Sequence, residues 1–254
     1  MGQTRVAQHR APRLFIESRL RSGATLELET GQAHYLRAVM RLDRDAAVAA
    51  FNAVDGEWRC RIAELGRRRV LLIVEGQLRP PETEPDLWLL FAPIKRARLD
   101  WLVEKATELG ISALMPVWTA RTQSERLNLE RLRAHAVEAA EQSERLSVPE
   151  LCAPETLGRV LGAWPHERPL IVCDESGAGE PIGEVATRLA RAPVAFLVGP
   201  EGGFDQTELD ALGKLSFVTR IGLGPRVLRA ETAAVAALAV FQAIAGDWRR
   251  ARTR

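Results

Sequence analysis

Two stretches decide the fold: Val198–Phe204, "VGPEGGF", and further along the chain Leu223–Thr232, "LGPRVLRAET". Each follows an apolar run typical of a strand, and each contains a Gly-Pro turn. Ligands of open parallel sheets bind in the crevice outside the carboxyl ends of the strands. Because glycine permits close backbone approach and proline fixes φ, we expect both segments to line one site made largely of rigid backbone.

The chain around these stretches alternates between strand and helix patterns. Near-continuous apolar runs predict strands at residues 87–94, 111–118, 169–175, 194–199 and 216–224. Helical periodicity predicts helices at 98–110, closed by Gly110, and at 127–146, 181–191, 205–213 and 230–246. This alternation is typical of an α/β domain whose mostly parallel sheet is covered on both faces.

The N-terminal part of the chain has a different pattern. Short apolar stretches at 13–18, 24–29, 47–53, 58–65 and 68–76 are separated by Gly-containing turn signals, which predicts a small β-barrel or sandwich. Residues 31–42 have helical spacing and would carry Arg37 and Arg41 on one exposed side. The Pro-rich stretch "LRPPETEPD", Leu78–Asp86, indicates a linker, so we expect domains at 1–79 and 87–254 joined by 80–86.

Charge is distributed unevenly along the 254 residues, although the formal net charge is only +2. Residues 1–80 hold 14 Arg, no Lys and 9 acidic residues, a charge of +5, whereas the remainder holds 21 basic and 24 acidic residues, a charge of −3. This asymmetry favours a module that faces a polyanion, joined to a nearly neutral body. No apolar run approaches a membrane span, so we expect a cytoplasmic protein.

Several familiar sites are excluded by motif. The cysteines, Cys60, Cys152 and Cys173, are widely spaced and never form CxxC, so we expect buried free thiols and no metal site. The chain lacks GxxxxGK[ST] and lacks GxGxxG at a first βα turn, which argues against the usual nucleotide-binding loops. A ligand poor in phosphate fits better.

"LVGPEGGF" and "GLGPRVLRAETA", in this order near the C-terminus, resemble the signature of the SPOUT methyltransferases, and specifically of the RsmE family, which methylates N3 of a uridine in 16S rRNA. "RLFIE" and "HYLRAVMRL" resemble that family's N-terminal PUA-like RNA-binding barrel, and "DWLVEKATELGISALMPVWTARTQ" and "AAEQSERLSVPE" resemble its central segments. The chain departs from the family's "EQSGR" at Glu144, which leaves the tight turn there an open question. The N-terminal residues through His9 have no assignment.

The resemblance implies a deep trefoil knot, bound S-adenosylmethionine without a metal, and a homodimer acting on 16S rRNA of the small ribosomal subunit. Arg229 is expected to stabilise negative charge on the uracil, and Glu231 to orient Arg229 or act as the base; a helix N-terminal role for Glu231 is equally open. The remaining expected site residues are, for the cofactor, Leu197, Gly199, Gly202, Gly222, Leu223, Gly224 and Leu228, and for RNA, Arg13, Arg37, Arg41, Lys95 and Arg121.

Two other functions remain open from the sequence. One is a noncatalytic RNA-binding protein that keeps the barrel and a collapsed knot. The other is a SPOUT methyltransferase with a different target, either a ribose 2′-oxygen or tRNA. The paired loops disfavour the first, because a binding module has no need of two aligned cofactor loops, and only the resemblance favours uridine N3 over the second.

Overall fold

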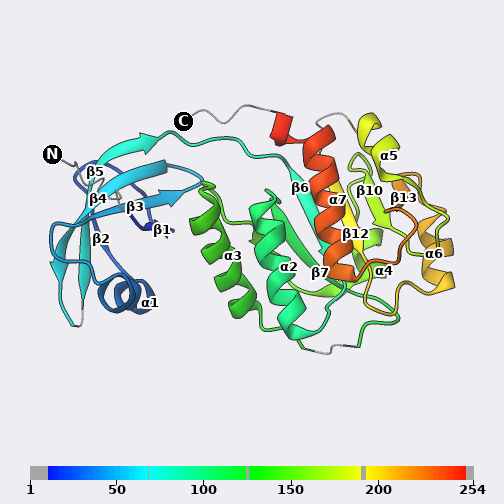
Figure 1. Cartoon of the computed structure of the whole chain (residues 1–254), viewed down its shortest axis with the longest axis horizontal. Helices are drawn as coiled ribbons and strands as arrows, with labels where there is room; N and C mark the ends of the chain where they lie inside the picture. Colours follow the sequence, from blue (N-terminus) through cyan, green and yellow to red (C-terminus); the bar gives the residue numbers. More distant parts are fainter. Residues whose placement is uncertain (1–10, 68, 124–125, 190–192, 250–254) are drawn as a thin grey trace, which may run out of the picture. The chain divides into compact units, whose positions relative to one another are not determined.

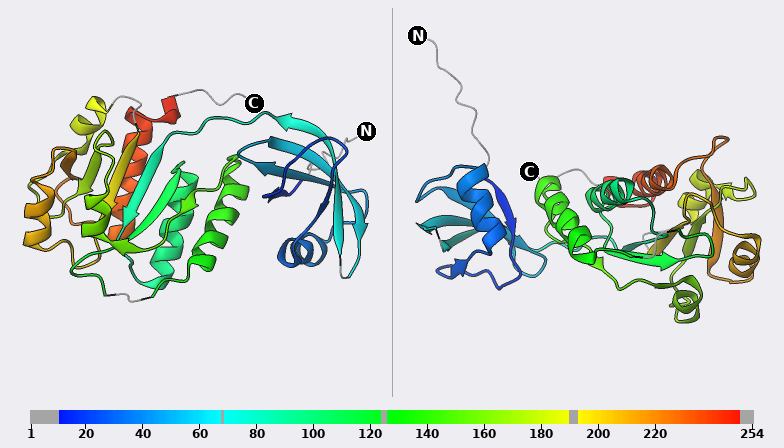
Figure 2. Two further views of the ribbon diagram at one scale, coloured as in Figure 1. Left: turned by 180° about the vertical axis from the view of Figure 1, so that it is seen from behind. Right: turned by 90° about the horizontal axis from the view of Figure 1, so that it is seen from below.

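The structure is a computed structural model that describes residues 11–67, 69–123, 126–189 and 193–249. The unassigned N-terminal residues through His9 lie outside the described residues. The chain divides into two compact units, residues up to Thr83 with Glu144–Ser147, and Glu84–Ser143 with Val148 onward. We describe each unit by itself, and Figures 1 and 2 show their elements.

The N-terminal unit contains a five-stranded sheet, as the number of expected strands predicts. Its elements are β1 (Arg13–Phe15), β2 (Thr25–Glu27), α1 (Thr30–His34), η1 (Tyr35–Val39), β3 (Ala47–Asn52), β4 (Gly56–Leu65) and β5 (Val70–Arg79). The strand order is β1-β3-β4-β5-β2, with β1 parallel to β3 and the other pairs antiparallel. Closure of this sheet into a barrel stays a prediction.

The expected continuous helix at 31–42 is wrong in detail. A five-residue α-helix passes into the π-helix η1, in which the Met40 amide donates to the Tyr35 carbonyl at 2.9 Å. Arg41 lies beyond the helix with a φ of 50°. Arg37 and Arg41 are therefore not neighbours on one regular helical face.

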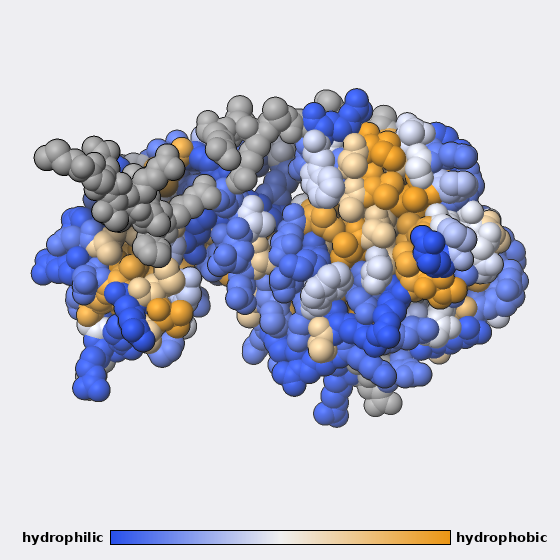
Figure 3. All heavy atoms as spheres, viewed as in Figure 1, coloured by the Kyte–Doolittle hydropathy of each residue, from blue (hydrophilic) through white to orange (hydrophobic). Residues whose placement is uncertain are grey.

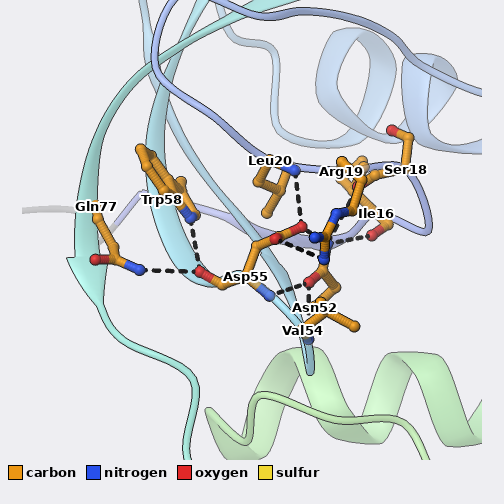
Figure 4. Close-up of polar contacts among 9 residues, drawn as sticks. All are labelled: Ile16, Ser18, Arg19, Leu20, Asn52, Val54, Asp55, Trp58 and Gln77. Atoms are coloured by element: carbon orange, nitrogen blue, oxygen red, sulfur yellow. Dashed lines mark hydrogen bonds and ion pairs between the residues drawn. The ribbon is translucent and has the colours of Figure 1, made fainter.

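The turn between β3 and β4 organises the loop that follows β1 (Figure 4). The Asn52 amide nitrogen donates to the Ser18 carbonyl at 3.1 Å, and its carbonyl oxygen accepts from the Asp55 amide at 2.7 Å. Asp55 in turn accepts from the Leu20 amide at 2.9 Å and pairs with Arg19 at 3.0 Å. The loop is thus held by side chains of the neighbouring turn, and Arg19 already has a counter-ion.

The segment Glu144–Ser147 belongs to the N-terminal unit although the sequence places it far from the rest of that unit. The guanidinium of Arg13 donates to the Arg145 carbonyl at 2.8 Å, and that of Arg79 donates to the Glu144 carbonyl at 2.7 Å. Glu144 has a φ of 64°, so the tight turn is made with a residue other than glycine.

The second unit is an α/β domain, as predicted. Its elements are β6 (Leu87–Phe91), α2 (Arg96–Glu108), β7 (Ala113–Trp118), α3 (Leu129–Ser143), β8 (Glu150–Leu151), β9 (Glu155–Thr156), α4 (Leu157–Gly162), β10 (Leu170–Cys173), β11 (Glu180–Pro181), α5 (Ile182–Arg188), β12 (Val194–Val198), α6 (Gln206–Leu212), β13 (Val218–Gly222), α7 (Ala230–Ile244) and η2 (Asp247–Arg249). The short elements β8, β9, α4, β11 and η2 were not expected from the sequence.

The sheet of this unit is parallel in all its pairings, with the order β11-β13-β10-β12-β6-β7-β8 and β9 beside β7. Helices cover both faces, α2, α3, α5 and α7 on one and α4 and α6 on the other (Figure 2). The prediction of a parallel sheet covered on both faces is confirmed. Burial on both faces explains why strands such as β12, whose five residues are all buried, are apolar throughout.

Helix ends in this unit follow local sequence signals. At the start of α6, Asp205 accepts from the Glu208 amide at 2.7 Å and Glu208 accepts from the Asp205 amide at 3.1 Å, a capping box. At the end of α2, Gly110 has a φ of 82° and the Ile111 amide donates to the Ala106 carbonyl. This is a Schellman arrangement, so the predicted role of Gly110 in ending the helix is confirmed.

Candidate cofactor site in the second unit

A cavity of about 520 Å³ lies at the carboxyl ends of β13, β10 and β12, which are neighbours in the sheet. Both Gly-Pro segments line it, as the strand-end argument predicts. The lining residues of the two segments are Val198, Gly199, Pro200, Glu201 and Gly203 from the first, and Gly222 through Ala230 from the second. We call residues 199–204 the first loop and residues 222–229 the second loop.

The first loop is packed against its own surroundings. The Gly203 amide donates to the Pro200 carbonyl at 2.9 Å, and a Cβ added at Gly199 would lie 3.0 Å from the ring of Phe204. Gly203 has a φ of 67°, and a Cβ there would lie 1.7 Å from a carboxylate oxygen of Glu175. Glycine is therefore favoured at 203 by its backbone conformation, and a side chain there would also displace the Glu175 carboxylate.

The second loop has few contacts of its own. Gly224 has a φ of 95°, and a Cβ there would meet no atom within 4 Å. Val227 is 83% exposed, and the side chains of Arg226 and Arg229 are exposed as well. Leu223 and Leu228 of this loop pack against the core, whereas Arg226, Val227 and Arg229 are exposed.

A third segment, residues 174–177 after β10, lines the same cavity and was missed from the sequence. The side chain of Asp174 is fully buried, pairs with Arg220 of β13 at 2.5 Å, and accepts from the Ser176 amide at 2.9 Å. Glu175 accepts from the Phe204 amide of the first loop at 3.2 Å. The signal was available, because the polar run "DESG" directly follows an apolar strand whose neighbours carry the other two loops.

At this edge of the sheet the pKa of the Asp174 carboxyl group is lowered, whereas the pKa of the Cys173 thiol is raised. Burial alone would raise the pKa of Asp174, but hydrogen bonds from Ser176 and the Arg220 guanidinium outweigh it and hold the pKa below its usual value. Burial, with a smaller contribution from Glu175, raises the pKa of the Cys173 thiol to about 12. Cys173 is therefore a neutral thiol at neutral pH and a poor nucleophile.

Arg98, near the start of α2, connects the first loop with the start of α7 and was also missed. Its Nε lies 3.5 Å from Oε1 of Glu231 in the first turn of α7, and its Nη1 lies 3.8 Å from Oε1 of Glu201 in the first loop. The other oxygen of Glu231 is buried and has no hydrogen-bond partner in the described part of the chain. Arg98 is the ion-pair partner of Glu231 in this structure, and the expectation that Glu231 orients Arg229 or acts as the base stays a prediction.

Most of the expected cofactor residues come together at the cavity. Gly199, Gly222, Leu223, Gly224 and Leu228 line it, and so does Arg229. The side chain of Leu197 instead packs in the core on the face of the sheet that α4 and α6 cover. Gly202 is absent from the lining, and its carbonyl accepts from the Arg121 guanidinium at 2.8 Å.

The expected RNA-binding arginines of the N-terminal unit differ in their availability. Arg13 is held in an internal ion pair with Glu57 at 2.5 Å, and its side chain is only 8% exposed. Arg37 donates to the carbonyls of Gly66 and Arg67 at 3.0 and 3.1 Å. Of these three, Arg41 is exposed and Arg13 and Arg37 are half-buried, and their contact with RNA stays a prediction.

The two expected RNA contacts of the second unit lie near the first loop. The amide of Lys95 points to Oε1 of Glu201 at 3.4 Å, and the Lys95 side chain is exposed. The Arg121 residue is exposed and carries the bond to Gly202 described above. Both cations therefore lie beside the loop that lines the cavity.

The described residues contain no cluster of three or more His, Cys, Asp or Glu side chains of the kind that holds a metal ion. Cys60 and Cys173 are buried free thiols as expected, and Cys152 is a half-buried one. Within the same residues, none of the helices has the length and apolar character needed to cross a membrane.

Comparison with known proteins identifies the family. A family model described as an RNA methyltransferase domain matches residues 81–242, and one described as an RNA methyltransferase PUA domain matches residues 28–75. Ribosomal RNA small subunit methyltransferase E of Rickettsia conorii is 34% identical over 229 residues, covering 89% of this chain and 93% of that protein. The Synechocystis protein of the same name is 31% identical, and the match covers 87% of this chain and 74% of that protein.

Solved structures agree with these sequence matches. A ribosomal RNA small subunit methyltransferase E from Neisseria gonorrhoeae, bound to S-adenosyl methionine, is 25% identical with a TM-score of 0.85, covering 94% of this chain and all of that one. A putative methyltransferase from Legionella pneumophila in complex with the same cofactor is 26% identical with a TM-score of 0.84, covering 93% and 98%. The chain therefore belongs to the RNA methyltransferase family, and within it to the ribosomal RNA small subunit methyltransferase E family.

Proposed function

We propose that this protein transfers a methyl group from S-adenosylmethionine to N3 of a uridine in 16S rRNA of the small ribosomal subunit. The observation that carries the proposal is the cavity formed by the two Gly-Pro loops at the ends of β12 and β13, the strands on either side of β10, in a chain of this family. The names of its relatives support the small-subunit substrate, and cofactor-bound structures of similar proteins support the methyl donor.

The cavity fits such a cofactor. Its volume of about 520 Å³ lies within the range of small-molecule pockets, and its lining includes Gly177, Gly199, Gly203, Gly222 and Gly224, the last at an open position. Gly199, Gly222, Leu223, Gly224 and Leu228 would hold the cofactor through backbone groups and apolar contact. Leu197 and Gly202 contribute by supporting the strand end and the first loop. The bound cofactor supplies an electrophilic methyl group, so no metal is needed for that step.

Arg229 is the catalytic residue of this proposal. Uracil N3 is a poor nucleophile while protonated, and negative charge spreads onto O2 and O4 as the proton leaves. Arg229 lines the cavity with an exposed side chain, so its guanidinium is available to stabilise that charge. Glu231 remains a candidate base, and it forms an ion pair with Arg98, which lines the cavity.

RNA would be bound through Lys95 and Arg121 beside the cavity and through Arg41 of the N-terminal unit, mainly by phosphate contacts. Arg37 would act by holding the turn at Gly66 and Arg67, and Arg13 by stabilising its unit. In this proposal residues 1–79 bind RNA and residues 87–254 carry the methyltransferase site, with 80–86 as the linker. The proposed substrate places the reaction in the cytoplasm.

A homodimer and a knot within the SPOUT class complete the proposal. The dimer is supported by the apolar surface over α7 (Figure 3), where Val235, Ala236, Ala239, Val240 and Ile244 remain half-buried, and by Trp101 of α2, which is 41% exposed. Such surfaces favour association. The knot, in which the second loop would thread through the chain, is proposed from the family resemblance alone, because strand order and register do not test it.

The decisive experiment is methyl transfer from labelled S-adenosylmethionine to small ribosomal subunits that lack the modification, followed by nucleoside mass spectrometry. We expect 3-methyluridine. A 2′-O-methylated product, or activity on tRNA alone, would keep the methyltransferase and overturn the target. Cofactor binding without transfer to any RNA would indicate a noncatalytic protein. Arg229→Ala should lower kcat about 100-fold, the loss typical of a removed charge-stabilising donor.

A further inference from the structure

The first loop contains two consecutive glycines, Gly202 and Gly203. Glycine loses more conformational freedom on folding than any other residue, so a glycine pair is ordered only where other groups fix its backbone. Both ends of the peptide group that joins this pair are engaged. The Gly203 amide donates to the Pro200 carbonyl at 2.9 Å, and the Gly202 carbonyl accepts from Nη1 of Arg121 at 2.8 Å. The peptide is therefore held from within the loop at one end and by Arg121 at the other.

Arg121 belongs to a turn that directly follows β7, and we call residues 119–122 the β7 turn. The Thr122 amide donates to the Thr119 carbonyl at 3.1 Å, and the Thr119 amide donates to the Thr122 hydroxyl oxygen at 3.0 Å. The two hydroxyl groups lie 2.8 Å apart. The β7 turn is thus closed by its own hydrogen bonds, with Ala120 and Arg121 as its central residues.

The β7 turn is also attached to the helix that follows the first loop. The Ala120 amide donates to Oε1 of Glu208 at 2.8 Å, and Oε2 of Glu208 accepts from the amide of Asp205, the N-cap of α6. The stem of Arg121 passes over the glycine pair, because a Cβ added at Gly202 would lie 3.6 Å from both Cβ and Cδ of Arg121. Contacts on both sides of the first loop therefore fix the place from which Arg121 reaches it.

We propose that Arg121 is a positioning residue for the cofactor, which holds the peptide between Gly202 and Gly203 and so keeps the first loop in its binding conformation. Arg121 does not line the cavity, whereas Glu201 and Gly203, on either side of Gly202, do. It acts on the cofactor through the loop, because the affinity for a ligand falls with the fraction of protein in the binding-competent conformation. This role rests on the proposed function, since it takes S-adenosylmethionine as the ligand, and it goes beyond the phosphate contact proposed for Arg121.

The test is calorimetric titration of the full chain with S-adenosylmethionine in the absence of RNA, for wild type, Arg121→Ala and Arg121→Lys. Without RNA, a lost phosphate contact cannot change the result. We expect the dissociation constant to rise about five- to tenfold in Arg121→Ala, the effect of losing one hydrogen bond that orders the loop. Arg121→Lys should restore most of the affinity, because the bond to Gly202 uses a single nitrogen.

Arg159→Ala is the matched control. Arg159 lies in α4, its side chain is 78% exposed, and it pairs with Glu155 of β9, which lies beside the end of β7. The substitution removes the same charge near the β7 turn without touching the first loop, so the dissociation constant should stay within about twofold of wild type.

Three results would contradict this role of Arg121. An unchanged dissociation constant in Arg121→Ala, with wild type binding the cofactor, would overturn it and leave the proposed function intact. Equal weakening in Arg159→Ala would assign the effect to net charge, and Arg121→Lys binding no better than Arg121→Ala would show that a charged donor does not hold the loop. Failure of wild type to bind the cofactor would overturn the proposed function as well. Arg121 is exposed, so both variants should be folded at the titration temperature, which circular dichroism checks.

Discussion

The first and second loops each contain a Gly-Pro step and follow β12 and β13, the strands on either side of β10, but their surroundings differ. In the first loop, added side chains at Gly199 and Gly203 would meet Phe204 and Glu175 at 3.0 and 1.7 Å. In the second, Gly224 has open space and Val227 is 83% exposed. The same dipeptide therefore lies in a tightly packed loop in one case and in a loop with an exposed tip in the other, so we expect substitutions to affect stability more in the first loop and ligand binding more in the second.

Asp174→Asn should cause the largest loss of stability, because Asp174 pairs with Arg220 of β13, the strand that leads into the second loop. The substitution leaves Arg220 without its buried counter-ion, and we expect a loss of about 3 kcal/mol in the free energy of unfolding at pH 7. Urea denaturation measures it.

The pH dependence of stability tests the same ion pair between Asp174 and Arg220. The pKa of Asp174 is lowered in the folded protein, so its stabilising contribution is complete above the unfolded value of about 3.9 and is lost as pH falls through the folded value. Wild type should therefore lose more stability on acidification than Asp174→Asn. Parallel profiles for the two proteins would show that the ion pair contributes no net stability.

Gly203→Ala should have the next largest effect. Alanine would adopt a φ of 67° at a cost, and its Cβ would displace Glu175 from the Phe204 amide, so we expect destabilisation of about 2 kcal/mol. Thermal and urea denaturation would report it. Gly158→Ala in α4 is the control, because no atom lies within 4 Å of its added Cβ and it should be neutral or slightly stabilising.

Gly224→Ala should separate stability from binding. The backbone conformation alone is strained, so unfolding should become easier by only about 1 kcal/mol. The added methyl group projects from a residue that lines the cavity, and the dissociation constant for S-adenosylmethionine should rise about tenfold, which corresponds to roughly 1.4 kcal/mol. Stability losses equal to those of Gly203→Ala would remove the distinction between the loops.

Val227→Ser should have the smallest effect on stability. The side chain is almost fully exposed, so the free energy of unfolding should change by less than about 0.5 kcal/mol. Denaturation at a protein concentration low enough to keep the chain monomeric is the measurement. A larger loss would mean that the second loop packs more tightly than its exposure indicates.

Strand-end reasoning located the site from the sequence, because apolar strands and Gly-Pro turns are local signals. Arg98 was missed since its partner Glu231 lies on an element distant in the sequence, and local patterns carry no information about such pairs. The expectation that Glu231 orients Arg229 or acts as the base came with the family resemblance, and it did not include the ion pair that Glu231 of α7 forms with Arg98 of α2. Arg13 looked like a surface cation because its acceptor, Glu57, lies on another strand.

The turn at Glu144–Ser147 has a consequence for how such a protein can be divided or recombined. The N-terminal unit is assembled from two separate lengths of chain, and the carbonyls of Glu144 and Arg145 receive the guanidiniums of Arg79 and Arg13. A gene fragment ending at residue 83 would encode those arginines without their acceptors. An exchange of this unit between relatives would therefore have to carry the four-residue turn along with the N-terminal coding region, as two coordinated replacements.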